Sequence, residues 1–240
     1  MSQPVPTGIS VLMPAHQLES SIADNLARVV AVVSNWVQSE VIVIDDGSTD
    51  DTRGFANKAA ALSDLVSVVG YDINRGKGGA LQEGFKYAAG EIIVFLDADL
   101  DLPPEQLPAF ISKFVEQDVD ALVGAKRSAM VPGRYPALRR LLSVAFAAVN
   151  RVLFRLPLKE TQTGLKVFKR GALESTLPQL QTLRYAFDLE LLVRIRKAGG
   201  KMAEAPVVLA PDSSSGLSLS TLWEMGRDTA LIWLRSFRWK

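Results

Sequence analysis

The sequence contains no cysteine, which excludes disulfide bonds and thiolate metal sites and fits a reducing compartment. It has no run close to the roughly 18 apolar residues that a membrane-spanning helix needs. The first residues, MSQPVPTG, lack the basic stretch and apolar core of a secretory signal peptide. No internal repeat or low-complexity tract is visible. With 48% hydrophobic residues among 240, we expect an ordinary globular protein with a sizeable core.

The formal net charge of +1 conceals a segregation of charge along the chain. Residues 1–125 carry 7 Lys and Arg against 18 Asp and Glu, a balance of −11. Residues 126–170 carry 11 against 1, a balance of +10, and residues 171–240 carry 9 against 7. Blocks of one sign are often only solvated faces. Here the basic block directly follows the acidic half, as if two differently charged groups must meet.

Apolar runs in the first half alternate with segments of helical periodicity. Near-continuous Val, Ile and Leu strands between helices predict an α/β fold with a mostly parallel sheet covered on both faces. Ligands bind such sheets beyond the carboxyl ends of the strands. All four predicted strand ends carry polar or glycine-rich residues. The predicted strands are 8–15, 40–48, 65–72 and 91–99, and the predicted helices are 20–37, 50–63 and 76–90.

Three aspartates occupy every second position after the fourth strand, in FLDADLDLPPE (95–105). If the strand continues, Asp97, Asp99 and Asp101 point to one side and converge. Adjacent carboxylates need a counter-charge, and a hard divalent cation with oxygen ligands is the natural one. Mg²⁺ or Mn²⁺ would leave coordination positions for water and substrate phosphates. D-x-D alone is compatible with a solvated turn, but its place at the end of a buried strand favours a metal–diphosphate site.

Two other strand exits allow a structural and a functional interpretation. In VIDDGSTDDT (43–52) the acids and Ser could form only a turn and a helix cap, yet Asp45 could accept a nucleobase imino N–H. NRGKGGA (74–80) could be a plain glycine turn, or a backbone N–H cradle for phosphate with Lys77 or Arg75 adding charge. A lone histidine is more often structural, so we do not expect His16 to act as a catalytic base.

The order of these motifs resembles the family 2 glycosyltransferases, which have the nucleotide-diphosphosugar transferase (GT-A) fold. The later half is similar to the polyprenyl-phosphate (dolichyl-phosphate) glucosyl- and mannosyltransferase branch. The resemblance spans about residues 8 to 235 and implies a nucleotide-sugar donor, with UDP-glucose favoured and GDP-mannose as the alternative. The motifs are SVLMPAHQLE, VIVIDDGSTDDT, NRGKGGALQEGFKYAAGE and IIVFLDADLDLPPE, then ETQTGLKVFKRGAL (160–173), YAFDLELLVRIRKAG (185–199) and EAPV (204–207).

The resemblance assigns roles position by position, with Asp99, Arg127, Asp188 and Glu190 as candidate catalytic residues. The last two occupy the place of the acidic motif that supplies a base in many saccharide-extending relatives. The usual P-x-Y-N-E opening departs here, because Glu19 comes one place late, and its donor contact is not carried over. The donor side comprises nucleoside contacts by Pro14, Ala15, His16, Asp45 and Asp46, with Lys77 beside the nucleotide and Asp97, Asp99 and Asp101 as metal ligands. The acceptor phosphate is assigned to Arg127, Arg139, Arg140, Gln162 and Lys166.

The two oppositely charged halves suit the two sides of such a reaction. A Mg²⁺ or Mn²⁺ ion held by Asp99 and its neighbours would neutralise the charge that develops on the nucleotide leaving group. A lipid monophosphate has a second pKa of about 6 and is largely ionised at neutral pH. It needs pairing with cations rather than a general base, and the basic block provides arginines for this. We therefore expect in-line displacement of the nucleotide with inversion.

Two stretches combine apolar residues with aromatic or basic ones, at 139–158 and 222–240. Both are typical of interfacial helices, although either could pack on the protein core or on a second subunit. We expect peripheral association with the cytoplasmic side of a membrane and no nucleic-acid partner, with a homo-oligomer left open. The expected organisation is one glycosyltransferase domain over 1–240. It consists of a nucleotide-sugar and metal half (8–125), an acceptor half (126–215) and a C-terminal amphipathic helix (216–240).

Three alternatives have distinct signatures. A nucleotidyltransferase would normally show a G-x-G-T-R-like opening after the first strand, where this chain has PAHQLE. A non-catalytic sugar-nucleotide-binding module would tolerate loss of the D-x-D acids or of the basic block, and both are present. Within the leading class, a transferase that uses a saccharide hydroxyl as acceptor is the main rival.

Overall fold

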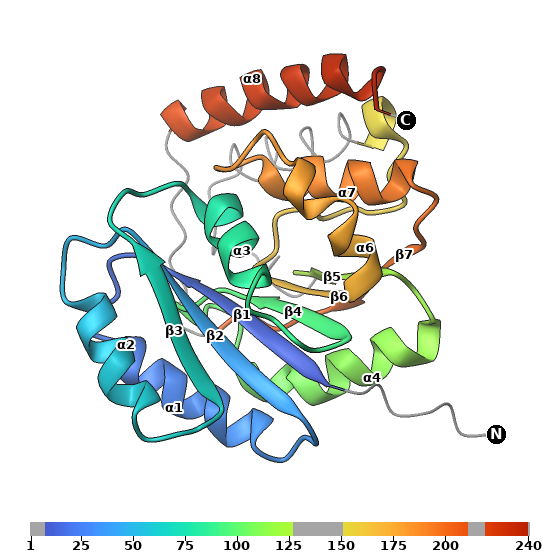
Figure 1. Ribbon diagram of the computed structural model, residues 1–240. Helices are drawn as coiled ribbons and strands as arrows, with labels where there is room; N and C mark the ends of the chain where they lie inside the picture. Colours follow the sequence, from blue (N-terminus) through green and yellow to red (C-terminus); the bar gives the residue numbers. More distant parts are fainter. Residues whose placement is uncertain (1–7, 127–150, 211–218, 240) are drawn as a thin grey trace.

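The computed structural model describes residues 8–126, 151–210 and 219–239. Within these residues, seven strands form one sheet in the order β3-β2-β1-β4-β6-β5-β7 (Figure 1). All neighbouring pairs are parallel except those of β6, which runs antiparallel to β4 and β5. The strands are β1 (Ile9–Ala15), β2 (Ser39–Asp46), β3 (Val66–Tyr71), β4 (Ile92–Leu96), β5 (Ala121–Ala125), β6 (Leu165–Lys169) and β7 (Met202–Pro206). The predicted α/β fold with a mostly parallel sheet is confirmed.

Helices cover both faces of the sheet, as the sequence predicts (Figure 1). Successive side chains of a strand point to opposite faces, so Val11 and Met13 of β1 enter one hydrophobic cluster and Leu12 enters the other. The first cluster is completed by α1, α2 and α4, and the second by α3, α6 and α7. The helices are α1 (Ile22–Val33), α2 (Thr52–Ala60), α3 (Lys77–Phe85), α4 (Leu107–Gln117), α6 (Arg170–Glu174), α7 (Phe187–Lys197) and α8 (Leu219–Ser236), with short 3-10 turns at Pro104–Gln106 and Leu177–Gln179.

The sheet order brings the predicted strand ends to one edge. Parallel β2, β1 and β4 are neighbours, so their carboxyl ends lie side by side. Antiparallel β6 starts at the same edge, because Leu165 pairs with Leu96 at the end of β4. The segment before β6 and the start of α7 therefore reach the edge where the donor motifs end.

The C-terminal helix α8 lies on the outside of α7 at the top of the view in Figure 1. Within the described ranges, no helix combines the length and the apolar character that crossing a bilayer requires. Of the predicted interfacial stretch 139–158, only 151–158 is described. Arg127, Arg139 and Arg140 lie outside the described residues.

Candidate functional site

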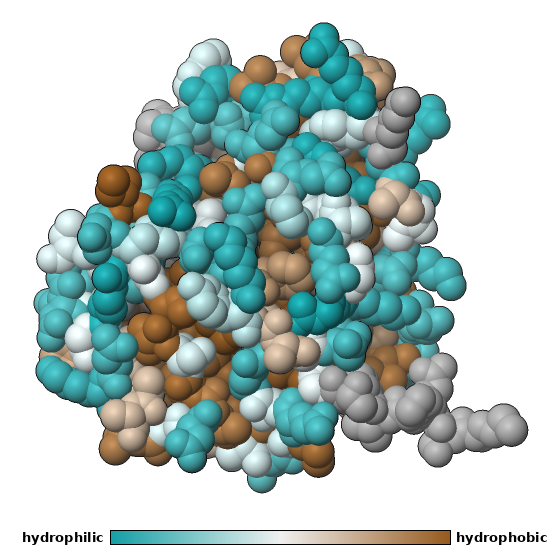
Figure 2. Space-filling model, in the orientation of Figure 1, coloured by the Kyte–Doolittle hydropathy of each residue, from teal (hydrophilic) through white to brown (hydrophobic). Residues whose placement is uncertain are grey.

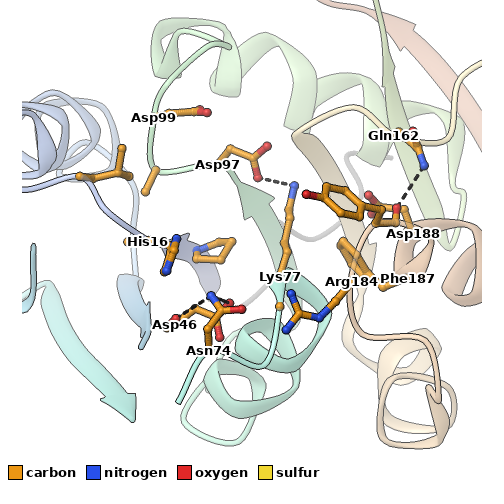
Figure 3. Close-up of a pocket in the computed structure, with 16 residues that line it drawn as sticks. His16, Asp46, Asn74, Lys77, Asp97, Asp99, Gln162, Arg184, Phe187 and Asp188 are labelled. Carbon is orange, nitrogen blue, oxygen red and sulfur yellow. Dashed lines mark hydrogen bonds and ion pairs between the residues drawn. The ribbon is translucent and has the colours of Figure 1, made fainter. Parts of the chain in front are cut away.

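A cavity of about 750 Å³ opens at the carboxyl edge of the sheet. Residues from both halves of the chain face one another across it (Figure 3). The acidic half contributes Pro14, Ala15, His16, Leu18, Asp46, Asn74, Gly76, Lys77, Asp97, Ala98 and Asp99. The second half contributes Gln162, Arg184, Tyr185, Phe187 and Asp188. The structure thus brings together most of the predicted donor residues and two of the candidate residues from the later motifs, Gln162 and Asp188.

Asp45 and Asp46 are adjacent in sequence but have different surroundings. Asp46 lines the cavity and fixes the loop between β3 and α3, because it accepts hydrogen bonds from the Tyr71 hydroxyl (2.7 Å) and the Arg75 N–H (2.8 Å). Burial and this bond to Asp46 raise the pKa of Tyr71. Asp45 is buried away from the cavity lining, and its Oδ2 lies 2.8 Å from Arg53 Nε. The structure therefore does not place Asp45 where the predicted nucleobase contact needs it.

The turn at the start of α3 uses its glycines for close packing. Gly76 has φ +86°, a conformation that side chains disfavour. A Cβ at Gly78 would lie 2.7 Å from Phe187 Cβ, and the Gly78 N–H donates to the Leu183 carbonyl at 2.8 Å. Since the Gly78 and Arg75 amides already have acceptors, they do not form the free phosphate cradle that the motif allowed. The turn instead docks α3 against the segment that leads into α7.

The three aspartates after β4 do not converge as extended strand. The strand ends at Leu96, and a turn follows in which the Leu100 N–H donates to the Asp97 carbonyl at 3.1 Å. Asp97 and Asp99 line the cavity, whereas Asp101 is absent from its lining and donates its N–H to Asp99 Oδ1 at 3.2 Å. Among the described residues, no three His, Cys, Asp or Glu side chains are grouped closely enough to hold a metal. The expectation of an extended three-carboxylate set was wrong, because the turn interrupts the alternation.

Asp97 and Asp99 nevertheless suit a divalent cation. Desolvation and the neighbouring charge of Asp97 raise the pKa of Asp99, so the Lys77 ammonium beside Asp97 does not balance both carboxylates. Gly164 permits the close approach of Asp97 to β6, since a Cβ there would lie 2.7 Å from Asp97 Cγ. Two carboxylates, completed by water and donor phosphates, are a common way to hold Mg²⁺ or Mn²⁺. These residues would hold the ion and leave its remaining positions to the donor.

Lys166 is placed differently from its predicted role at the acceptor phosphate. Its side chain is 1% exposed, and its Nζ lies 2.6 Å from Asp188 Oδ1 and 2.5 Å from the Thr163 carbonyl. Lys166 is absent from the cavity lining, while Asp188 and Gln162 are part of it. Lys166 therefore contacts the site through Asp188 and does not face an acceptor directly.

Glu190 also points away from the cavity. Residues two apart on a helix lie about 200° apart around its axis, so only Asp188 of the predicted acidic pair lines the cavity. Glu190 is fully buried and ion-paired with Arg194 at 2.8 Å. It also accepts the Thr182 N–H at 2.8 Å, which fixes the turn before α7. Nothing in this geometry supports a catalytic role for Glu190.

The displaced Glu19 has a structural contact. Its Oε2 accepts the Asp51 N–H at 3.0 Å. The neighbouring Gln17, with φ +57°, accepts the Thr49 and Asp50 N–H groups through its side-chain oxygen. Together they tie the loop after β1 to the loop after β2.

The further cavity residues without a predicted role include Asn74, Arg184, Tyr185 and Phe187. Asn74 follows a predicted strand end, and Tyr185 and Phe187 lie in the quoted YAFDLELL motif. All three could therefore have been selected from the sequence. Arg184 could not, since its position depends on the packing of α3 against residues 183–187. Its guanidinium adds a positive charge to the part of the cavity wall that the second half of the chain provides.

Comparison with known proteins agrees with this geometry. Residues 10–177 match the glycosyl transferase family 2 profile. The glycosyltransferase AglD of Haloferax volcanii is 30% identical over 217 residues, which cover 88% of this chain but only 34% of that relative. The dolichyl-phosphate beta-glucosyltransferase of Saccharomyces cerevisiae is 26% identical, with 93% and 73% of the two chains covered. The undecaprenyl-phosphate mannosyltransferase of Micrococcus luteus is 27% identical, with 83% and 82% covered. This chain therefore spans about a third of the Haloferax relative and most of the other two.

The solved structures show the same fold. Glucosyl-3-phosphoglycerate synthase from Mycobacterium tuberculosis, in complex with Mn²⁺, UDP-glucose and phosphoglyceric acid, superimposes with a TM-score of 0.74 at 22% identity. The match covers 96% of this chain and 79% of that one. At this identity the likeness concerns the GT-A fold, while the family profile covers most of the sequence and separates the chain from the nucleotidyltransferases. The chain belongs to glycosyl transferase family 2 and is similar to the polyprenyl-phosphate sugar transferases of that family.

Proposed function

We propose that this glycosyltransferase moves a hexose, with inversion, from a nucleotide diphosphosugar to a polyprenyl phosphate such as dolichyl phosphate. Residues 8–125 form the donor and metal half, and residues 126–215 form the acceptor half. Relatives named for dolichyl-phosphate and undecaprenyl-phosphate transfer support the lipid acceptor. The glucosyltransferases among them favour UDP-glucose as donor, and the mannosyltransferase keeps GDP-mannose as the alternative.

The observation that carries the proposal is the buried ion pair between Asp188 and Lys166 (2.6 Å). A saccharide hydroxyl needs a general base, and Asp188 is the acid-motif residue that lines the cavity. If Asp188 took up a proton, Lys166 would be left as an unpaired ammonium in the interior, which is strongly unfavourable. An acceptor that is already ionised avoids this cost. The geometry thus favours a phosphate nucleophile over a hydroxyl.

Different residues around the cavity would bind the nucleoside, hold the cation and orient the acceptor. The wall of Pro14, Ala15 and His16 would bind the nucleoside, and Lys77 would lie beside its diphosphate. The divalent cation held by Asp97 and Asp99 would neutralise the leaving diphosphate. Gln162 and Arg184 face the donor side from the second half and would orient the acceptor phosphate. A phosphate oxygen then attacks the anomeric carbon as the bond to the nucleotide breaks, which inverts that carbon.

The proposal predicts selective use of phosphorylated lipid. Purified protein with Mn²⁺ is incubated with labelled UDP-glucose or GDP-mannose and with a polyprenyl phosphate, the matching polyprenol, or a soluble saccharide. We expect a labelled lipid product only with the phosphate, and with UDP-glucose in preference to GDP-mannose, because the ionised phosphate needs no base. Transfer to the polyprenol or the saccharide at the same rate would contradict the phosphate acceptor.

The outer face of α8 supports a further part of the proposal, contact with a lipid surface. Trp223 and Leu234 of α8 are 75% and 58% exposed, and Phe237 directly after the helix is 69% exposed, whereas Asp228 and Thr229 of the helix are buried. The helix therefore exposes large apolar side chains in addition to the apolar residues Met225 and Ile232 that it buries. Figure 2 shows hydrophobic and hydrophilic residues side by side along this upper edge. Arg227 and Arg238 are exposed between the apolar residues, as in helices that lie at the headgroup level of anionic membranes.

We expect the double substitution Leu234→Gln/Phe237→Gln to weaken sedimentation with anionic liposomes several-fold, because it removes the exposed apolar area of α8. The protein should stay folded, since both side chains are exposed. The matched control is Val37→Gln/Leu62→Gln, two apolar residues that are 82% and 88% exposed elsewhere on the surface. If Leu234→Gln/Phe237→Gln sediments with liposomes like the parent and the control, α8 does not bind lipid. The same conclusion follows if this double substitution dissociates a dimer and leaves sedimentation unchanged.

A further inference from the structure

Lys77 links the two halves of the cavity. It begins α3, and its ammonium forms an ion pair with Asp97 Oδ1 at the end of β4 (Figure 3). The same ammonium lies 5.8 Å from the centre of the Phe187 ring at the start of α7. The Lys77 side chain is 29% exposed, so its ion pair with Asp97 is only partly accessible to water. Burial disfavours the charged amine, but the attraction of Asp97 and Asp188 outweighs it and raises the pKa of Lys77. Lys77 thus remains a cation between carboxylates of both halves.

The ion pair engages one of the two carboxylates that would hold a metal. Asp97 and Asp99 are the cavity carboxylates that suit a divalent cation, and Lys77 already contacts Oδ1 of the first. An ammonium and a divalent cation repel each other and compete for one carboxylate oxygen. Asp97 has little freedom to turn away, because its carboxylate packs against Gly164. For the cation to bind both carboxylates, the side chain of Lys77 has to move.

Lys77 has other negative partners within the same cavity. Asp188 lines the cavity and is one of the charges that stabilise its ammonium. The diphosphate of a donor would add a second, and a lysine at the start of a helix is well placed for phosphate. The flexible stem of lysine permits such a change without moving the backbone.

We propose that Lys77 holds the place of the divalent cation on Asp97 in the empty enzyme and exchanges Asp97 for the donor diphosphate when cation and nucleotide bind. This inference rests on the proposed function and adds to it a coupling between the binding of the cation and the binding of the nucleotide. When the cation alone displaces Lys77, the ammonium is left only with Asp188, which is already paired with Lys166. Cation and nucleotide together give Lys77 a new partner. Binding of the two ligands is then positively coupled, and each raises the affinity for the other by the same factor.

The test measures Mn²⁺ binding without any transfer reaction. The electron paramagnetic resonance signal of free Mn²⁺ gives the affinity of the parent and of Lys77→Met, each with and without UDP or GDP. Without nucleotide, we expect Lys77→Met to bind Mn²⁺ at least about tenfold more tightly, within the usual range of such couplings. With nucleotide, the parent should gain several times more Mn²⁺ affinity than the variant. Lys77→Gln serves as a second variant, and thermal unfolding checks that both are folded.

Arg184→Met is the matched control, because it removes a positive charge from the same cavity but not from Asp97. If Arg184→Met strengthens Mn²⁺ binding as much as Lys77→Met, the effect is general electrostatics and the proposal is wrong. Unchanged or weaker Mn²⁺ binding by both Lys77 variants would also overturn it while leaving the proposed function intact. If neither parent nor variants bind Mn²⁺ even with nucleotide, the metal site fails together with this inference.

Discussion

Asp99→Asn is expected to abolish sugar transfer while leaving the protein folded. A metal ion contributes several kcal/mol to charge stabilisation in the transition state, and a loss of about 4 kcal/mol corresponds to about 10³-fold in rate. Asp99 is exposed in the cavity, so no core contact is lost. The repulsion from Asp97, which raises the pKa of Asp99, is relieved by the neutral amide. The unfolding free energy should therefore stay the same or rise slightly, while Mn²⁺-dependent transfer disappears.

Asp72→Asn is the control for this prediction, because Asp72 is an acid of the same edge whose side chain is 94% exposed. It should keep the parent rate within about twofold, as surface substitutions usually do. Transfer by Asp99→Asn at the parent rate, or full activity of the parent in excess EDTA, would refute the metal role. Asp101→Asn adds a separate result. A loss as large as that of Asp99→Asn would mean that the turn at 97–101 rearranges around the cation and restores the predicted three-carboxylate set.

The fold of the first half could be predicted because its strands carry a local signal. Runs such as VIVI in β2 and IIVFL in β4 are buried on both faces, which is typical of parallel strands between helices. The later strands are five residues each, and one of them, β6, runs antiparallel. Its direction depends on a long connection after β5 and not on local pattern. No individual strand beyond residue 99 could therefore be predicted from the sequence.

The site could be predicted at the level of segments, and less well at the level of side chains. The strand-exit rule located the edge and identified Asp46, Lys77, Asp97 and Asp99. It could not separate Asp45 from Asp46, because that difference arises from Arg53, eight positions along the chain.

The acceptor side shows the same limit. Lys166 and Asp188 belong to two different motifs and lie 22 positions apart in the sequence. Only the packing of α7 on β6 shows that they form a buried pair. The motifs thus predicted which segments lie near the cavity. Which side chains reach the cavity depends on how each residue is buried and on the residues that it contacts.

That buried pair leads to the largest expected effect on stability. Lys166 is 1% exposed and Asp188 is 4% exposed, and their charged atoms lie 2.6 Å apart. Lys166→Met would leave the Asp188 carboxylate buried with its main partner removed. Removing one partner of a buried ion pair typically costs about 3–5 kcal/mol. This is a large part of the roughly 5–15 kcal/mol by which native proteins are stable. We expect a clearly lower urea midpoint for Lys166→Met.

The double variant Lys166→Met/Asp188→Leu separates the two roles of the pair. Replacing both charges by apolar side chains removes the unpaired carboxylate, so much of the lost stability should return. Transfer to a polyprenyl phosphate should remain measurable in the double variant, since an ionised acceptor needs no base from Asp188. Lys169→Met on the same strand is the control. Lys169 is 45% exposed and paired with Asp118 at the surface, so its loss should cost about 1 kcal/mol or less. If Lys166→Met unfolds at the same urea concentration as Lys169→Met, the pair does not hold Asp188 in place, and the argument against Asp188 as a base loses its support.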